Sequence, residues 1–134
     1  MTSTALVDRL RAKGLQLTAQ RRAIAEALDG ANRHLSPDEL LVQARARMPE
    51  IGRATVYKAL TAFTATGEVR QVQFDDGPTL YDPNAHVDHH HLVCERCGAV
   101  WDAFIDMAIP PTAQDGFTPT GIDVTVTGVC GECG

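Results

Sequence analysis

The chain has 134 residues, a formal net charge of -5, 44% hydrophobic residues and 22% charged residues, which together indicate a folded protein of one medium-sized or two small domains. It has no run of about 18 apolar residues and no apolar segment of a secretory signal near its N-terminus, so we expect a cytoplasmic protein without a membrane partner. The overall negative charge by itself argues against nucleic acid as a partner.

The first half of the chain has the pattern of four helices followed by a hairpin. The third helix has the clearest start, because Ser36 is an N-cap residue, Pro37 suits the first helical position and Glu39 completes a capping box. Apolar residues recur at helical spacing in each segment. Helices are expected over 3–13, from Thr18 to about Leu28, from Ser36 to Pro49 and from Arg53 to Thr66, and strands over 68–74 and 79–81 around a turn at 75–77.

Helices followed by a short hairpin are typical of a winged helix-turn-helix. The recognition helix would be 53–66, with Val56 and Leu60 facing the core and its first turns facing the DNA major groove. Tyr57 is suited to contact a thymine methyl group with its ring and a base or phosphate with its hydroxyl group. A plain helical bundle explains the same pattern and stays open on this evidence alone.

The charges are divided unequally between the two halves. Residues 1–74 contain 11 Lys and Arg against 7 Asp and Glu, a balance of +4, whereas residues 75–134 contain one Arg against 10 acidic residues, a balance of -9. The second half also contains every cysteine and four of the five histidines. This asymmetry predicts a basic module followed by an acidic module rich in metal-binding side chains.

The cysteines form two CxxC pairs, Cys94 with Cys97 and Cys130 with Cys133. Each pair offers two thiolates to one ion, and two pairs complete the tetrahedral shell of a structural zinc site. A pair of redox-active dithiols is the alternative, but such chemistry normally uses a single CxxC at a helix start. The zinc would join the strand around 91–94 to the C-terminus.

A histidine tract precedes the first cysteine pair. If 89–94 is a strand, His89 and His91 share one face, and a returning strand at 99–104 brings Asp102 close to them. Imidazole and carboxylate groups without a thiolate suit Fe²⁺, Mn²⁺ or Zn²⁺. A solvated loop without metal is the alternative interpretation of the tract.

In this order, the motifs resemble those of the ferric uptake regulator family of metal-dependent bacterial repressors. The resemblance covers about Leu10 to Cys133 and implies an α+β fold: a winged helix over 1–80, a hinge at 81–85, and a small α/β dimerisation domain with a Cys₄ zinc site over 86–134. The motifs that carry it are Leu17-Thr18-Ala19-Gln20-Arg21, Ala54-Thr55-Val56-Tyr57, the segment from His89 to Gly98 and the final Gly128-Val129-Cys130-Gly131-Glu132-Cys133.

The resemblance also implies roles for particular residues. The regulatory metal, Fe²⁺ or Mn²⁺, would be bound between the domains and would set the distance between the two recognition helices of a homodimer on an inverted-repeat operator. His86, Asp88 and His90 remain as donors for an additional site. The implied regulatory ligands are His34, Asp82, His89, His91 and Asp102, and the expected DNA contacts are Arg21, Arg53, Thr55, Tyr57 and Lys58.

The two aspartates of the regulatory set, Asp82 and Asp102, resemble the ligands of the peroxide-sensing branch of the family. The segment Tyr81-Asp82-Pro83-Asn84-Ala85-His86 resembles the actinobacterial members of that branch. That branch implies a repressor in which metal-catalysed oxidation of a ligand histidine, here His34 or His89, releases the metal. The alternative is a metal-uptake regulator for iron, zinc or nickel. An enzyme is not expected, because the HxE…PCxxC signature of zinc deaminases is missing and four cysteines closing one site leave no position for water.

Overall fold

The computed structural model describes residues 5–31, 33–74, 76–84, 90–104, 116–118 and 122–134. The chain divides into two compact units, an N-terminal unit, Met1–Val87, and a C-terminal unit, Asp88–Gly134. Among the described residues, no helix is long and apolar enough to cross a membrane.

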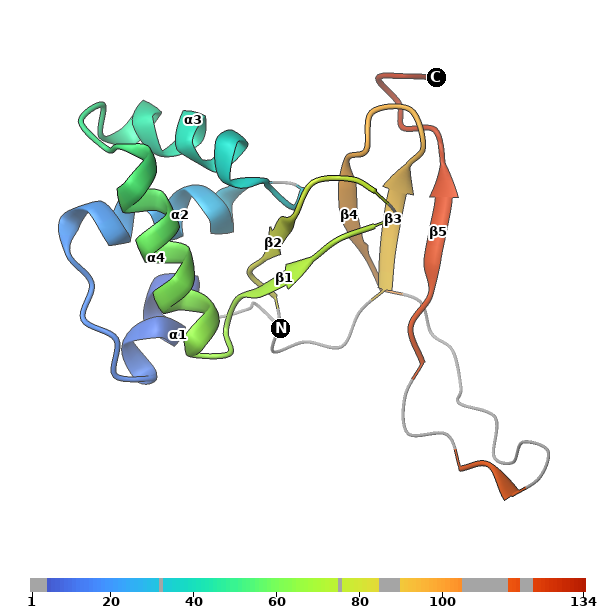
Figure 1. Ribbon diagram of the computed structural model, residues 1–134, viewed down its shortest axis with the longest axis horizontal. Coiled ribbons are helices and arrows are strands. Elements are labelled where there is room, and N and C mark those ends of the chain that lie inside the picture. Colours follow the sequence, from blue (N-terminus) through green and yellow to red (C-terminus); the bar gives the residue numbers. More distant parts are fainter. Residues whose placement is uncertain (1–4, 32, 75, 85–89, 105–115, 119–121) are drawn as a thin grey trace. The chain divides into compact units, whose positions relative to one another are not determined.

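Four helices form most of the N-terminal unit (Figure 1): α1 (Leu6–Ala12), α2 (Ala19–Gly30), α3 (Pro37–Arg47) and α4 (Arg53–Ala65). The predicted caps are confirmed. The Thr18 hydroxyl accepts a hydrogen bond from the Arg21 amide, and Ser36 and Glu39 form the complete capping box of α3. Helix α1 has no side-chain cap of its own, and its Leu6 amide instead donates to Asp29 Oδ2 of α2 at 3.0 Å.

The apolar stripes of the four helices meet in one core. Val56 and Leu60 of α4 are buried, as the sequence predicts for the inward face of the recognition helix. Gly67 ends α4 with φ of +84°, a left-handed conformation that favours glycine. The largest fully buried side chains of this core are Phe63, Leu6, Leu10, Ile24, Leu28, Leu40, Ile51, Leu60, Val56 and Val69.

Strands β1 (Arg70–Val72) and β2 (Leu80–Asp82) complete the N-terminal unit as an antiparallel hairpin. Both are shorter than or shifted from the expected 68–74 and 79–81, but the helix-then-hairpin order of a winged helix is confirmed. On its other side β2 forms a single bridge with the segment before α3, between Tyr81 and Leu35. Tyr81 and Asp82 therefore belong to a strand, within the range 81–85 that the resemblance assigned to a hinge.

The described part of the C-terminal unit is a three-stranded sheet of order β4-β3-β5 (Figure 1). Strand β3 (His90–Cys94) lies in the centre, antiparallel to β4 (Val100–Ala103) and parallel to β5 (Thr125–Gly128). The predicted return strand at 99–104 is thus confirmed. Helices in one unit and strands in both give the α+β class expected from the sequence.

Candidate metal centres and DNA-binding face

The four cysteines come together at one end of the three-stranded sheet. Cys94 is the last residue of β3, and a turn closed by the hydrogen bond from the Gly98 amide to the Cys94 carbonyl presents Cys97 beside it. The second pair follows β5, whose Gly128 lies opposite Cys94 in the parallel ladder. All four Sγ atoms lie within 4.8 Å of one another. This cluster fits a tetrahedral Cys₄ zinc site, and it joins β3 to the C-terminal turn as predicted.

Backbone amides around the cluster favour a thiolate at Cys94. The amides of Cys97 and Cys130 point at its Sγ atom from 3.5 and 3.4 Å. These donors lower the pKa of Cys94 from 9.0 to about 6. The neighbouring Cys130 side chain, with burial, raises the pKa of Cys133 to about 12. One cysteine is therefore prepared as an anionic ligand, and a divalent cation is needed to make the whole cluster anionic.

Two of the expected regulatory ligands, His34 and Asp82, lie together inside the N-terminal unit. The bridge between Leu35 and Tyr81 places their neighbours His34 and Asp82 side by side, and His34 Nδ1 is 3.7 Å from Asp82 Oδ1. Both side chains are buried, with exposed fractions of 3% and 0%. A buried imidazole beside a buried carboxylate is a donor set suited to a divalent transition metal.

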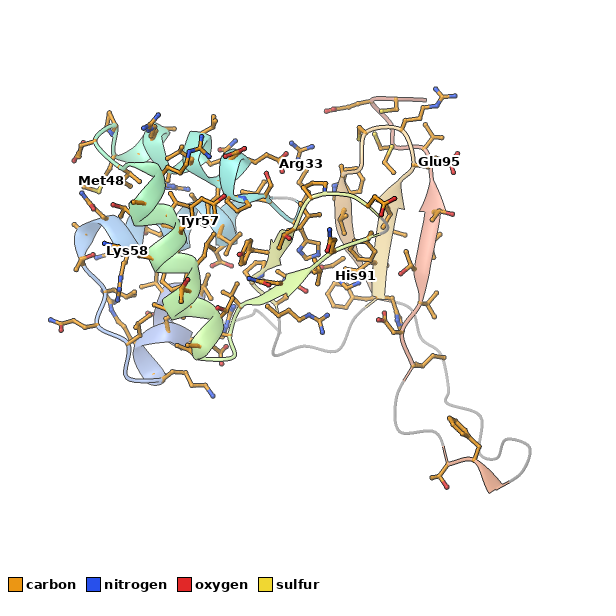
Figure 2. All side chains as sticks on the ribbon, viewed as in Figure 1. Arg33, Met48, Tyr57, Lys58, His91 and Glu95 are labelled. Carbon is orange, nitrogen blue, oxygen red and sulfur yellow. The ribbon has the colours of Figure 1, made fainter. Side chains whose placement is uncertain are left out.

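Two further expected ligands, His91 and Asp102, face each other within the C-terminal unit. His91 of β3 is the direct partner of Asp102 of β4 in the antiparallel register, and His91 is buried on the central strand (Figure 2). This pairing confirms the predicted proximity of Asp102 to the histidine tract. His89, the fifth expected ligand, lies outside the described residues, as do His86 and Asp88.

His90 has a different environment from His91, because successive residues of a strand point to opposite faces. Its Nδ1 accepts a 2.9 Å hydrogen bond from the Val124 amide, which leaves the ring proton on Nε2. His90 thus fastens β3 to the segment that leads into β5. This contact gives the residue a structural task that sequence reasoning had not assigned.

The expected DNA contacts are spread over α2 and the first turns of α4. Tyr57 and Lys58 lie exposed on α4 (Figure 2), with Tyr57 47% exposed, whereas Thr55 is half-buried. Arg53 forms an exposed ion pair with Asp38 of α3, and this hydrogen bond raises the pKa of Arg53 above its ordinary value. Arg21 follows the Thr18 cap of α2 and is half-buried.

Sequence reasoning missed Arg70, whose Nε atom lies 3.4 Å from Asp82 Oδ2. The signal was present, because Arg70 and Asp82 are equally distant from the expected turn, and a hairpin centred on Asp76 pairs them directly. By residue type alone, Arg70 is one of the basic residues of the first half, and no motif distinguishes it from the others. The ion pair between Arg53 and Asp38 was also missed, because Arg53 was expected to contact DNA.

Comparison with known proteins identifies the family. Residues 12–125 match the model of the ferric uptake regulator family. The chain belongs to the ferric uptake regulator family. Members of this family are transcriptional regulators that respond to metals and bind DNA as dimers.

Two relatives illustrate the range of named functions in the ferric uptake regulator family. The peroxide-responsive repressor PerR of Staphylococcus epidermidis is 33% identical over 129 residues, covering 92% of this chain and 85% of that protein. The transcriptional regulator FurA of Mycobacterium tuberculosis (strain ATCC 25618 / H37Rv) is 32% identical over 130 residues, covering 94% and 88%. The family resemblance inferred from the sequence is therefore confirmed, while both kinds of name occur among its relatives.

Solved structures of metal uptake regulators share the fold. A zinc-bound manganese uptake regulator has a TM-score of 0.78 at 24% identity, covering 95% of this chain and 99% of that one, and so supports the fold alone. The ferric uptake regulator of Pseudomonas aeruginosa with manganese has a TM-score of 0.69 at 28% identity, covering 96% and 99%. The expected fold class is thus confirmed.

Proposed function

We propose that this member of the ferric uptake regulator family is a metal-dependent repressor that senses peroxide. Family membership already establishes a metal-responsive regulator. The observation that carries the finer proposal is the chemistry of the regulatory donors, because His34, Asp82, His91 and Asp102 supply nitrogen and oxygen and no sulfur. Such a set binds Fe²⁺ and Mn²⁺ without the thiolate that favours zinc.

The regulatory site is proposed to be shared by the two units. His34 and Asp82 form one half of the donor set and His91 and Asp102 the other, and each half is assembled within its own unit. His89 completes the proposed set. A metal held by both halves selects one orientation of the units, and by the family's dimeric organisation that orientation sets the spacing of two recognition helices on an inverted repeat.

Two of the proposed ligands, His34 and His89, are the expected oxidation targets. Fe²⁺ held by these residues would activate H₂O₂. In net terms one peroxide oxygen would be inserted at an imidazole carbon, and the other would leave as water. The oxidised ring is a weaker ligand, so the metal would lose one of its ligands and would dissociate more readily. The burial of His34 supports this role, because a buried ring is reached by a small oxidant formed beside it more readily than by bulk oxidants.

The proposed DNA-binding face consists of Arg21, Arg53, Thr55, Tyr57 and Lys58. Its support is the exposure of Tyr57 and Lys58 on a helix whose opposite side is fully buried. The net charge of +4 in the first half gives the electrostatic attraction that the whole chain lacks.

A homodimer is proposed to form through the C-terminal unit. Strand β5 lies at an edge of the described sheet, and Leu92 and Val126 are each at least 40% exposed on neighbouring strands. Large apolar side chains exposed on neighbouring strands of a sheet are suited to burial against a second copy. A zinc ion bound by the four cysteines beside them would hold the ends of β3 and β5 together.

The test compares the Fe²⁺-loaded and Mn²⁺-loaded forms of the zinc-containing protein. We expect both to bind an inverted-repeat operator, and only the Fe²⁺ form to lose binding in micromolar H₂O₂. Mass spectrometry is expected to find one added oxygen atom on the peptides containing His34 or His89. Unmodified peptides with retained DNA binding would instead support the alternative, a metal-uptake regulator for iron, zinc or nickel.

A further inference from the structure

Asp82 has a basic side chain, Arg70, beside it as well as the proposed metal ligand His34. Strand β2 lies between two partners, with β1 on one side and the segment that carries His34 and Leu35 on the other. Arg70 is therefore the direct ladder partner of Asp82 across the hairpin, and His34 is its neighbour on the opposite side. A buried carboxylate placed in this way needs cationic or hydrogen-bonding partners.

The two oxygen atoms of Asp82 make different contacts. Oδ1 accepts a 2.8 Å hydrogen bond from the Asn84 amide and lies 3.7 Å from His34 Nδ1. Oδ2 accepts from Arg70 Nε at 3.4 Å. The oxygen nearer the histidine thus accepts from a backbone amide, whereas the other oxygen faces the half-exposed guanidinium group of Arg70.

The ion pair of Arg70 with Asp82 has the features of a replaceable contact. Its distance is long for a charge-assisted hydrogen bond, and Arg70 is 47% exposed although Asp82 is fully buried. The pair of Arg9 with Glu68 in the same unit is different, since its atoms are 3.0 Å apart and both side chains are about one-tenth exposed. The Arg9 guanidinium group also donates to the Pro83 carbonyl, so it is held by more than one acceptor.

We propose that Arg70 is the counter-ion of Asp82 in the metal-free protein. Through this contact it sets the metal concentration at which the regulator responds. This inference depends on the proposed role of Asp82 as a ligand of the regulatory metal. In the metal-free protein the guanidinium group compensates the buried carboxylate. A divalent cation replaces it, and Arg70 moves its charge into solvent, which its exposure allows.

As a consequence, Arg70 lowers the affinity of the regulatory site for a divalent metal below the value that the donor set alone would give. Metal binding must displace a favourable contact and must also act against the positive charge of a nearby guanidinium group. Removing that charge therefore strengthens metal binding, even though it removes a contact from the metal-free protein. A residue that merely stabilised the hairpin would change folding stability and leave metal affinity unchanged.

The experiment measures Mn²⁺ binding to the full-length, zinc-loaded protein from the electron paramagnetic resonance signal of free Mn²⁺. We expect Arg70→Gln to tighten Mn²⁺ binding by about tenfold, the effect of one nearby unit charge in a partly buried site. Arg70→Lys, which keeps the charge, is expected to remain close to the wild type. Arg22→Gln is the matched control, because it removes the same charge from an exposed ion pair with Glu26 on α2.

A second measurement separates the outcomes. Without Mn²⁺, Arg70→Gln is expected to lower the melting temperature, and saturating Mn²⁺ is expected to raise it by more than in the wild type. Equal or weaker Mn²⁺ binding by Arg70→Gln would overturn the inference, as would an equal gain in Arg22→Gln. Asp82→Asn tests the proposed function separately: if it leaves Mn²⁺ binding intact, Asp82 is not a ligand and both proposals fail.

Discussion

The backbone amide of Cys130 donates a 3.4 Å hydrogen bond to the Sγ atom of Cys94, 36 residues earlier in the chain. The parallel pairing of β3 with β5 creates this contact, because it brings Gly128 opposite Cys94 and the following turn over the sulfur atom. The strand pairing thus prepares the sulfur electrostatically for a cation. This contact is one cause of the lowered pKa of Cys94.

Cys94 is expected to ionise well below its neighbours in the zinc-free protein. Its pKa falls from 9.0 to about 6, because the amides of Cys97 and Cys130 stabilise the thiolate. A lowered folded-state pKa adds stability that is complete above about pH 9 and is lost as the pH falls through about 6. Ultraviolet absorbance of the thiolate during a pH titration should show this first step, and Cys94→Ser should remove it. A titration with no thiolate until about pH 8, the ordinary range of cysteine, would contradict the expectation.

Zinc removal is expected to destabilise the C-terminal unit much more than the N-terminal unit. The described sheet of the C-terminal unit has a small core, whereas the N-terminal unit has a continuous one. Binding of a structural zinc is worth about 10–16 kcal/mol in small zinc domains, so its loss removes a large share of the stability of a unit with few apolar contacts. Chelation or Cys97→Ser should therefore lower the melting temperature of the β-sheet circular dichroism signal and leave that of the helical signal nearly unchanged. An unchanged melting temperature of the sheet signal in zinc-free protein would show that the cluster is dispensable.

Replacing His91 and replacing His90 should have different effects. His91 is paired with Asp102 and is a proposed metal ligand, whereas His90 accepts from the Val124 amide. His91→Ala is expected to weaken Mn²⁺ binding at least about tenfold, the typical scale for loss of one interaction at a metal site. His90→Ala is expected to lower the melting temperature of the C-terminal unit and to keep Mn²⁺-dependent DNA binding. Mn²⁺ titrations and thermal unfolding of both variants check this, and loss of metal binding in both would show that the two faces are not distinct.

Lys58 is expected to contribute one phosphate contact to DNA binding. It is exposed on α4 next to Tyr57, on the side opposite to the buried Val56 and Leu60. Lys58→Ala should weaken operator binding and reduce the slope of log affinity against log salt by about one, since one fewer counterion is released. Lys58→Arg keeps the charge and should keep the slope. Fluorescence anisotropy at several salt concentrations measures both, and an unchanged slope in Lys58→Ala would remove this residue from the interface.

Ser36 is expected to stabilise the N-terminal unit through the capping box of α3. Its hydroxyl accepts from the Glu39 amide at 3.2 Å, and the Glu39 carboxylate accepts from the Ser36 amide at 3.0 Å. Ser36→Ala should cost about 1 kcal/mol of unfolding free energy, the usual value of an N-cap. Urea denaturation followed by circular dichroism measures this loss. Thr61→Ala on the exposed side of α4 is the control, and an equal loss there would mean that the cap itself contributes nothing.

Local features of the sequence were sufficient to predict the helices and the ligand types. The start of α3 was predictable because Ser36, Pro37 and Glu39 satisfy the free amides of a helix start using residues adjacent in the chain. The Cys₄ cluster was predictable because each CxxC brings two sulfur atoms together within one turn. The opposite charges of the two halves likewise depend on composition alone.

The tertiary structure decided which of these residues meet and what else contacts them. Strand pairing brings Cys130 to Cys94 and places Arg70 beside Asp82, and both contacts depend on a register that few local signals specify. Strand geometry also gives His90 and His91 different partners, although in the sequence the two are adjacent members of one histidine tract. The sequence by itself determined which chemical groups are available, because that depends on residue type and local spacing. Only the fold determined their partners, because burial and charge pairing arise between segments distant in the chain.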